Sequence, residues 1–180
     1  MAVSESADMA ACGTAAPLVK SVTWDARPAR CEWSATTREV APTLSICLRC
    51  RDGREAEHQG VRGGARLAEA ICQHAAQQGC DVGLRGISCM SQCKRPCVIS
   101  LTAPEAFTYV FGDLDPSRPD HVQAILDLMP LYNIAPEGYL ARDARPEPLR
   151  ASILGRLPAI GSSNAIVSAL SAPTPAGKLL

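Results

Sequence analysis

The chain has 180 residues, enough for one domain with tails, and its 47% apolar and 20% charged content excludes general disorder. Eighteen basic and eighteen acidic side chains cancel, so no overall charge attracts nucleic acid or anionic lipid. No apolar run approaches the roughly 20 residues that span a bilayer, and the first residues lack the pattern of a secretory signal. We therefore expect a cytoplasmic protein with no nucleic-acid or membrane partner.

The first half of the chain predicts one strand and one helix after an unpatterned start. Residues 1–42 mix Ala, Ser, Thr and Pro without periodicity, which indicates a flexible N-terminal arm. The short apolar run 43–47 predicts a strand. A glycine-rich loop follows, and apolar residues at helical spacing then predict a helix over 65–78 that ends before Gly79.

The second half predicts three further strands and one helix. Residues 81–87 form a weaker strand pattern, and the β-branched and aromatic runs 98–101 and 107–111 predict a hairpin. Asp120 is a candidate cap for a helix whose apolar stripe is Val122, Ile125, Leu126 and Met129. Residues 136–180 are charged and proline-punctuated, and we expect a largely irregular C-terminal extension.

The order strand, helix, strand, strand, strand, helix defines an α/β domain over residues 43–135. A strand-helix-strand start favours a crossover in which the first two strands are parallel. The hairpin then extends the sheet, and both helices need a sheet face on which to bury their apolar stripes. The prediction is a two-layer sandwich of β-α-β-β-β-α order, with loops at the strand ends that carry the cysteines.

Nine cysteines are unusual for a chain in a reducing compartment, where clustered thiols indicate metal or redox chemistry. Cys47 and Cys50 form a C-x2-C pair, and Cys89, Cys93 and Cys97 form C-x3-C-x3-C. Each group follows a predicted strand, so neighbouring strands would bring the sulfurs together. Four thiolates suit either tetrahedral zinc or an iron-sulfur cluster.

Other readings of these residues stay open. Cys47 and Cys50 could be incidental buried thiols or a redox dithiol, which needs a helix N-terminus to depress a thiol pKa. The long loop after Cys50 delays the helix and disfavours the dithiol. Cys72 and Cys80 fit core positions, and His58 is either a loop histidine or a substitute ligand. Cations that could offset the charge of a centre flank the pairs: Arg49, Arg51, Arg54, Lys94 and Arg95.

The segment Gly-Ile-Ser-Cys89-Met-Ser-Gln-Cys93-Lys-Arg-Pro-Cys97-Val-Ile-Ser, followed by Phe-Thr-Tyr-Val-Phe, resembles the second half of the thioredoxin-like [2Fe-2S] ferredoxins. The stretch 44–135, including Phe-Gly-Asp-Leu-Asp at 111–115, more closely resembles the DUF1636 family of predicted metal-binding proteins. These resemblances imply a thioredoxin-like fold and a centre bound by cysteines. Cys97 lies about where the ferredoxins tend to have proline and is an alternative ligand.

The favoured hypothesis is a [2Fe-2S] ferredoxin-like electron-transfer protein with Cys47, Cys50, Cys89 and Cys93 as ligands and a redox partner protein. The alternatives are a structural or metal-handling Zn²⁺ protein that uses four cysteines, and a thiol-disulfide oxidoreductase that uses Cys47 and Cys50. No catalytic triad, carboxylate pair or phosphate loop occurs, which favours a carrier or metal-binding protein over an enzyme.

Overall fold

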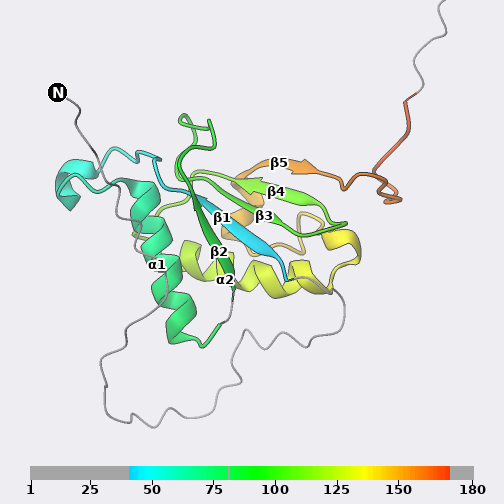
Figure 1. The fold of residues 1–180 in the computed structure, drawn as a ribbon, viewed down its shortest axis with the longest axis horizontal. Helices are drawn as coiled ribbons and strands as arrows, with labels where there is room; N and C mark the ends of the chain where they lie inside the picture. Colours follow the sequence, from blue (N-terminus) through cyan, green and yellow to red (C-terminus); the bar gives the residue numbers. More distant parts are fainter. Residues whose placement is uncertain (1–40, 81, 171–180) are drawn as a thin grey trace, which may run out of the picture.

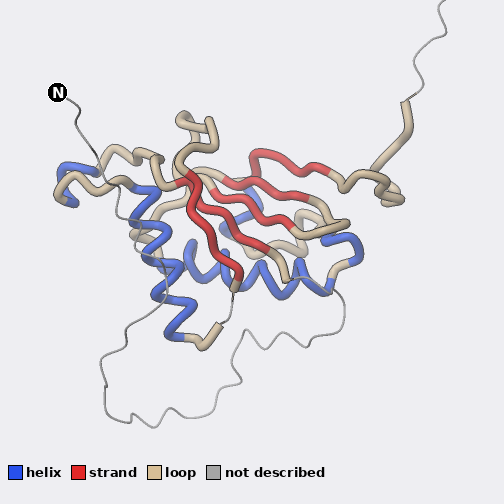
Figure 2. Tube along the Cα trace, in the orientation of Figure 1, coloured by secondary structure: helices blue, strands red, loops and turns tan. Residues whose placement is uncertain are grey.

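One mixed sheet with the strand order β2-β1-β3-β4-β5 forms the centre of the computed structural model, which describes residues 41–80 and 82–170 (Figures 1 and 2). The strands are β1 (Thr43–Cys47), β2 (Gly83–Ile87), β3 (Ile99–Thr102), β4 (Thr108–Phe111) and β5 (Ile153–Leu157). The helices are α1 (Gly63–Gln77), α2 (Pro119–Ile134) and α3 (Pro148–Ala151), with 3-10 turns η1 (Glu55–His58) and η2 (Pro136–Gly138). The predicted two-layer α/β sandwich with the order β-α-β-β-β-α is confirmed, and α3 and β5 are added to it.

The strand directions determine which loops meet. β1 runs parallel to β2 and antiparallel to β3, and β3 and β4 form the expected antiparallel hairpin. The carboxyl ends of β1, β2 and β4 and the amino end of β3 therefore lie at one edge of the sheet. In Figure 1 the loop after β2 rises from this edge.

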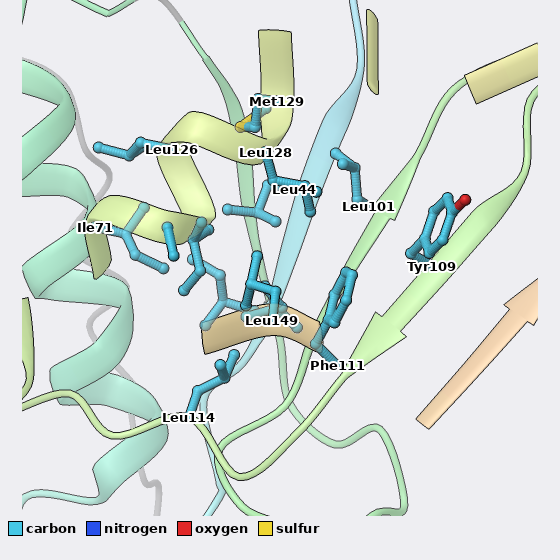
Figure 3. Close-up of a cluster of buried hydrophobic side chains, with 14 of the residues drawn as sticks. Leu44, Ile71, Leu101, Tyr109, Phe111, Leu114, Leu126, Leu128, Met129 and Leu149 are labelled. Atoms are coloured by element: carbon cyan, nitrogen blue, oxygen red, sulfur yellow. The ribbon is translucent and has the colours of Figure 1, made fainter. Parts of the chain in front are cut away.

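The core lies between the sheet and the helices. Strand side chains alternate between the two faces, so every second residue of β1, β3 and β4 points towards α1 and α2. Figure 3 shows these strand residues meeting the helical stripes and Leu149 of α3. The fully or almost fully buried members include Leu44, Ile46, Leu67, Ile71, Leu101, Tyr109, Phe111, Val122, Ile125, Leu126, Met129 and Leu149. All four predicted stripe residues of the second helix are thus confirmed as core.

The opposite face of the sheet carries small and polar side chains. Ser45 of β1 lies beside Ser100 of β3, which lies beside Val110 of β4. Ser45 is fully buried, and its hydroxyl accepts a hydrogen bond of 2.7 Å from Arg85 Nε on β2. The strands thus alternate between large apolar side chains on the core face and small or polar ones on the other.

The start of α2 differs from the prediction. Arg118, not Asp120, occupies the N-cap position, and Pro119 is the first helical residue, where its missing N–H costs nothing. Asp120 lies inside the first turn and accepts hydrogen bonds from the Arg118 guanidinium. A carboxylate in the first turn complements the helix dipole without capping the helix.

The sequence analysis did not predict the order found between residues 136 and 157. There β5 pairs antiparallel with β4, Leu149 is fully buried, and the Phe107 N–H donates to Glu137 O at 2.7 Å. Alternation in β5 is weak because Gly155 and Arg156 interrupt its apolar pattern. Residues 1–40 of the predicted N-terminal arm and residues 171–180 of the predicted C-terminal extension lie outside the described part of the chain, whereas residues 136–170 lie inside it. Within the described residues, no helix has the length and apolar character that crossing a bilayer requires.

Candidate metal centre

The C-x2-C pair occupies a buried turn at the end of β1. Cys47 is the last residue of β1, where its N–H donates to Val98 O at 2.9 Å, and the Leu48 N–H donates to Ile87 O at 2.8 Å. Cys47 and Cys50 are 3% and 4% exposed. The Cys50 thiol lies within hydrogen-bonding reach of the Cys47 thiol and receives a backbone hydrogen bond from Val98. Burial, followed by the contact with Cys47, raises the pKa of Cys50 to about 11.

The C-x3-C pair lies on the exposed loop between β2 and β3. Both Cys89 and Cys93 are exposed, and their thiols are in side-chain hydrogen-bonding contact. The Ser91 N–H donates to Cys89 Sγ at 3.3 Å, and this bond is the main reason that the pKa of Cys89 lies below its ordinary value. A backbone N–H directed at a sulfur is the kind of contact that stabilises a ligating thiolate.

Cys97 lies two residues before the start of β3. It is fully buried, and its backbone forms reciprocal bonds with Leu114, from Cys97 N–H to Leu114 O at 3.2 Å and back at 3.4 Å. Cys50, Cys47 and Asp52 are close enough to act on its thiol electrostatically. Burial is the main cause that raises the pKa of Cys97 to about 12, so the metal-free protein carries a neutral thiol here.

The structure thus brings all the predicted cysteines to one end of the sheet. Cys89 contacts Cys93, Cys93 acts electrostatically on Cys50, and Cys50 contacts Cys47. Among residues 41–80 and 82–170, however, no three His, Cys, Asp or Glu side chains are arranged closely enough to hold a metal ion. The two pairs are neighbours without forming a closed coordination shell.

The helix N-terminus approaches the C-x2-C turn despite the long intervening loop. The Gly64 N–H in the first turn of α1 donates to Cys50 O at 3.1 Å. A Cβ at Gly64 would lie 2.0 Å from Cys47 O, so only glycine permits this packing. The first-turn N–H is therefore used by a carbonyl oxygen and not by a thiol.

Sequence reasoning missed an ion-pair network that lies beside the cysteines. Asp52 pairs with both Arg66 and Arg54, and Arg54 also pairs with Asp115. The Asp52 and Arg66 side chains are only 9% and 11% exposed. Burial alone would raise the pKa of Asp52, but the Arg54 N–H and the Arg66 guanidinium outweigh it and leave the pKa lowered.

The segment after β4 connects both cysteine loops to this network. Asp113 accepts from Arg95 Nε at 2.5 Å, Leu114 pairs with Cys97, and Asp115 accepts from Arg54. The motif Phe-Gly-Asp-Leu-Asp at 111–115 could have indicated these contacts. It leaves β4 at the edge of the sheet where the cysteines lie, so its two carboxylates must be near them. Of the predicted flanking cations, Arg54 and Arg95 are ion-paired, and Arg49, Arg51 and Lys94 form no ion pair with another described residue.

The other described cysteines and histidines that the sequence offered do not join the five candidate ligands. Cys72 and Cys80 are half-buried, and Cys80 packs against the core. His58 is half-buried in η1, and nothing in the described residues joins it to the thiols. His121 is half-buried on α2, and its Nδ1 accepts the Asp115 N–H at 3.1 Å.

Comparison with known proteins gives one family. The family model described as "Protein of unknown function (DUF1636)" matches residues 44–159, which include all the candidate ligands and β5. No curated protein and no solved structure matches the chain. The resemblance to this family is confirmed, and the likeness to ferredoxins is not.

Proposed function

This chain belongs to the DUF1636 family, and we propose that it is a metal-binding protein that holds a [2Fe-2S] cluster on Cys47, Cys50, Cys89 and Cys93. One observation carries the proposal. The turns that follow the adjacent parallel strands β1 and β2 bring two cysteine pairs to the same edge of the sheet, where Cys93 and Cys50 interact. The proposed role of the protein is electron transfer.

The donor set fits such a group. Thiolates are the preferred ligands of iron-sulfur clusters, and a bound [2Fe-2S] cluster accepts and releases one electron. The backbone N–H of Ser91 is directed at Cys89 Sγ, and a backbone hydrogen bond from Val98 reaches the Cys50 thiol. Such bonds favour the thiolate and, with the nearby cations, raise a reduction potential.

Ligation requires the exposed pair to move towards the buried pair. Cys47 and Cys50 are fixed by β1, by Val98 and by the packing of α1 against their turn. Cys89 and Cys93 lie on a loop in which residues 91–95 are all exposed and Met90 alone packs against the core, so few buried contacts oppose its displacement. We therefore assign the adjustment to the 88–95 loop.

Cys97 is the alternative ligand. The Cys97 thiol lies near the thiols of Cys50 and Cys47. The exposed loop, however, interacts with this buried pair through Cys93 and Cys50, which favours Cys93 over Cys97 as a ligand. Burial disfavours its thiolate, so Cys97 would ligate only if a bound metal displaced its proton. The individual serine variants below separate the two ligand sets.

The environment of Cys50 weighs against the dithiol alternative. A redox C-x2-C motif uses a thiol whose pKa is lowered, often by a helix N-terminus. Here both thiols of the motif are buried, and the first-turn N–H of Gly64 binds the carbonyl oxygen of Cys50 and no thiol. Zinc uses the same four thiolates, so metal identity must be measured.

The test is anaerobic purification of the full chain, with visible absorption and the iron, sulfide and zinc content per chain. We expect a brown-red protein with two irons and two sulfides per chain. Cys50→Ser and Cys93→Ser should lose the metal, and Cys72→Ser, a half-buried cysteine on α1, is the matched control that should keep it.

Three results would change the conclusion. Zinc without iron or sulfide would replace the cluster with the zinc alternative. A folded wild-type protein without bound metal after anaerobic reconstitution would refute metal binding. If Cys89→Ser keeps the metal and Cys97→Ser loses it, then Cys97 replaces Cys89 as a ligand.

A further inference from the structure

A second site is indicated by a buried arginine in the segment between η2 and α3. Arg145 is 5% exposed, and its Nε donates to Ala141 O at 3.3 Å. Its Nη1 is buried and has no hydrogen-bond partner, and no ion pair within the described part of the chain includes Arg145. An arginine keeps its charge at any ordinary pH, so a full positive charge lies out of water without a counter-ion.

The charged side chains that act most strongly on Arg145 are themselves cations. Burial is the main cause that lowers the pKa of the Arg145 guanidinium, and repulsion from Arg156 and Arg142 adds to it. The other strong electrostatic influences come from Tyr109 and Tyr139, and no carboxylate is among them. Among the described residues, no carboxylate forms an ion pair with Arg142, Arg145 or Arg156.

The fold holds these cations in place. Arg156 of β5 lies opposite Tyr109 of β4, and its guanidinium stacks 4.7 Å from the centre of the Tyr139 ring. The Tyr109 hydroxyl, drawn at the outer end of its ring in Figure 3, accepts the Leu140 N–H at 2.7 Å. This bond anchors the start of the segment between η2 and α3 to β4.

A second arginine fixes the backbone of the same segment. Arg150 of α3 donates from Nε to Arg145 O at 2.9 Å and from Nη2 to Asp143 O at 3.0 Å. Arg142 Nη1 donates to Arg150 O at 3.2 Å. These contacts use carbonyl oxygens, so they orient the cations without neutralising them.

We propose that Arg145, Arg156 and Arg142 form an oxyanion site that takes a phosphate group, either free or carried on a small molecule. Removing an ion from water costs several kcal/mol unless a counter-ion compensates it, and the guanidinium fork matches phosphate oxygens. The unused Nη1 of Arg145 is buried, while Arg142 is exposed and Arg156 half-buried, so an anion arriving from solvent would meet Arg142 and Arg156 first. The site does not depend on the cysteine centre.

The test titrates the full chain with inorganic phosphate, by calorimetry and by thermal unfolding, against sodium chloride of equal ionic strength. We expect saturable binding of one phosphate per chain and a midpoint of unfolding that rises with phosphate but not with chloride. A parallel titration with glycerol 3-phosphate distinguishes the sources, because tighter binding of the ester indicates a ligand that carries the group.

Variants then locate the site. Arg156→Gln should weaken phosphate binding about tenfold or more, because it removes a charge-assisted bond. Arg145→Lys keeps the charge but lacks the fork and should weaken it similarly. Arg62→Gln, an arginine on the start of α1 that donates only to Arg49 O, is the control and should bind within about twofold of wild type.

Since Arg145 variants can fail to fold, the decision rests on wild type and Arg156→Gln. The proposal is overturned if wild-type protein binds neither phosphate nor the ester at concentrations up to about 10 mM, a dissociation constant too weak for a built site. It is also overturned if Arg156→Gln binds as tightly as Arg62→Gln.

Discussion

The backbone N–H of Gly64 donates to the carbonyl oxygen of Cys50, so the first turn of α1 rests directly on the C-x2-C turn. The two residues are joined across a loop that contains η1, and their contact fixes the buried half of the candidate centre. Any side chain at position 64 must push this turn away from the helix, because its Cβ would meet Cys47 O.

Gly64→Ala should therefore destabilise the protein by about 1–3 kcal/mol, the usual cost of overpacking a rigid contact. The free energy of unfolding from urea titration measures the effect. Gly155→Ala is the matched control, since its Cβ would meet nothing closer than Leu157 at 3.9 Å. Equal stability of the two variants would show that α1 does not pack on the turn as described.

Asp52→Asn should cost about 3 kcal/mol or more, because it leaves the buried Arg66 charge without its carboxylate. Asp113→Asn breaks an ion pair with Arg95 in which both side chains are nearly half exposed, and it should cost less than about 1 kcal/mol. Both values come from denaturant unfolding at pH 7. If Asp113→Asn lost more stability than Asp52→Asn, the structure would be wrong about which of the two ion pairs is buried.

Acid should destabilise the wild-type protein partly through Asp52 and Asp115, whose folded-state pKa values lie below those of the unfolded chain. Such groups stabilise the fold at pH values above the ordinary carboxyl range, and this stability is lost as pH falls through their lowered pKa values. The pH dependence of unfolding below about pH 5 should therefore be shallower in Asp52→Asn than in wild type. Identical slopes in the two proteins would argue against a lowered pKa for Asp52.

Alkylation of the metal-free protein should distinguish the cysteines. Cys89 is exposed and has a lowered pKa, so iodoacetamide should modify it at a lower pH than an ordinary thiol. Cys97 is buried and its pKa is raised to about 12, so it should remain unmodified at pH 8 until the protein unfolds. Mass spectrometry of peptides measures both, and equal rates at the two cysteines would contradict the structure.

A chain that ends at residue 135 should fail to fold cooperatively, whereas one that ends at residue 159 should fold. The shorter chain lacks β5 and the buried Leu149, and a buried leucine alone contributes about 2–5 kcal/mol. Circular dichroism during thermal unfolding provides the comparison. Cooperative unfolding of the shorter chain would restore the boundary that the sequence predicted.

Much of the fold follows from local patterns in the sequence. The run 43–47 alternates and ends at a cysteine, and β1 has those bounds. The apolar stripe from Val122 to Met129 is buried as predicted, because helical periodicity alone determines which side chains share a face. β5 was missed because its pattern is weak and its partner strand is distant in sequence, so only pairing with β4 stabilises it.

For the candidate site, the sequence by itself determined the five cysteines, their spacing and their place after strands. Only the tertiary structure decided that Cys97 and the C-x2-C pair are buried while Cys89 and Cys93 remain in solvent. It also placed Asp52 against Arg66 and left Arg145 without an ion pair to any other described residue. The physical reason is that burial and charge pairing depend on which segments meet in space, and neither spacing nor composition encodes those long-range contacts.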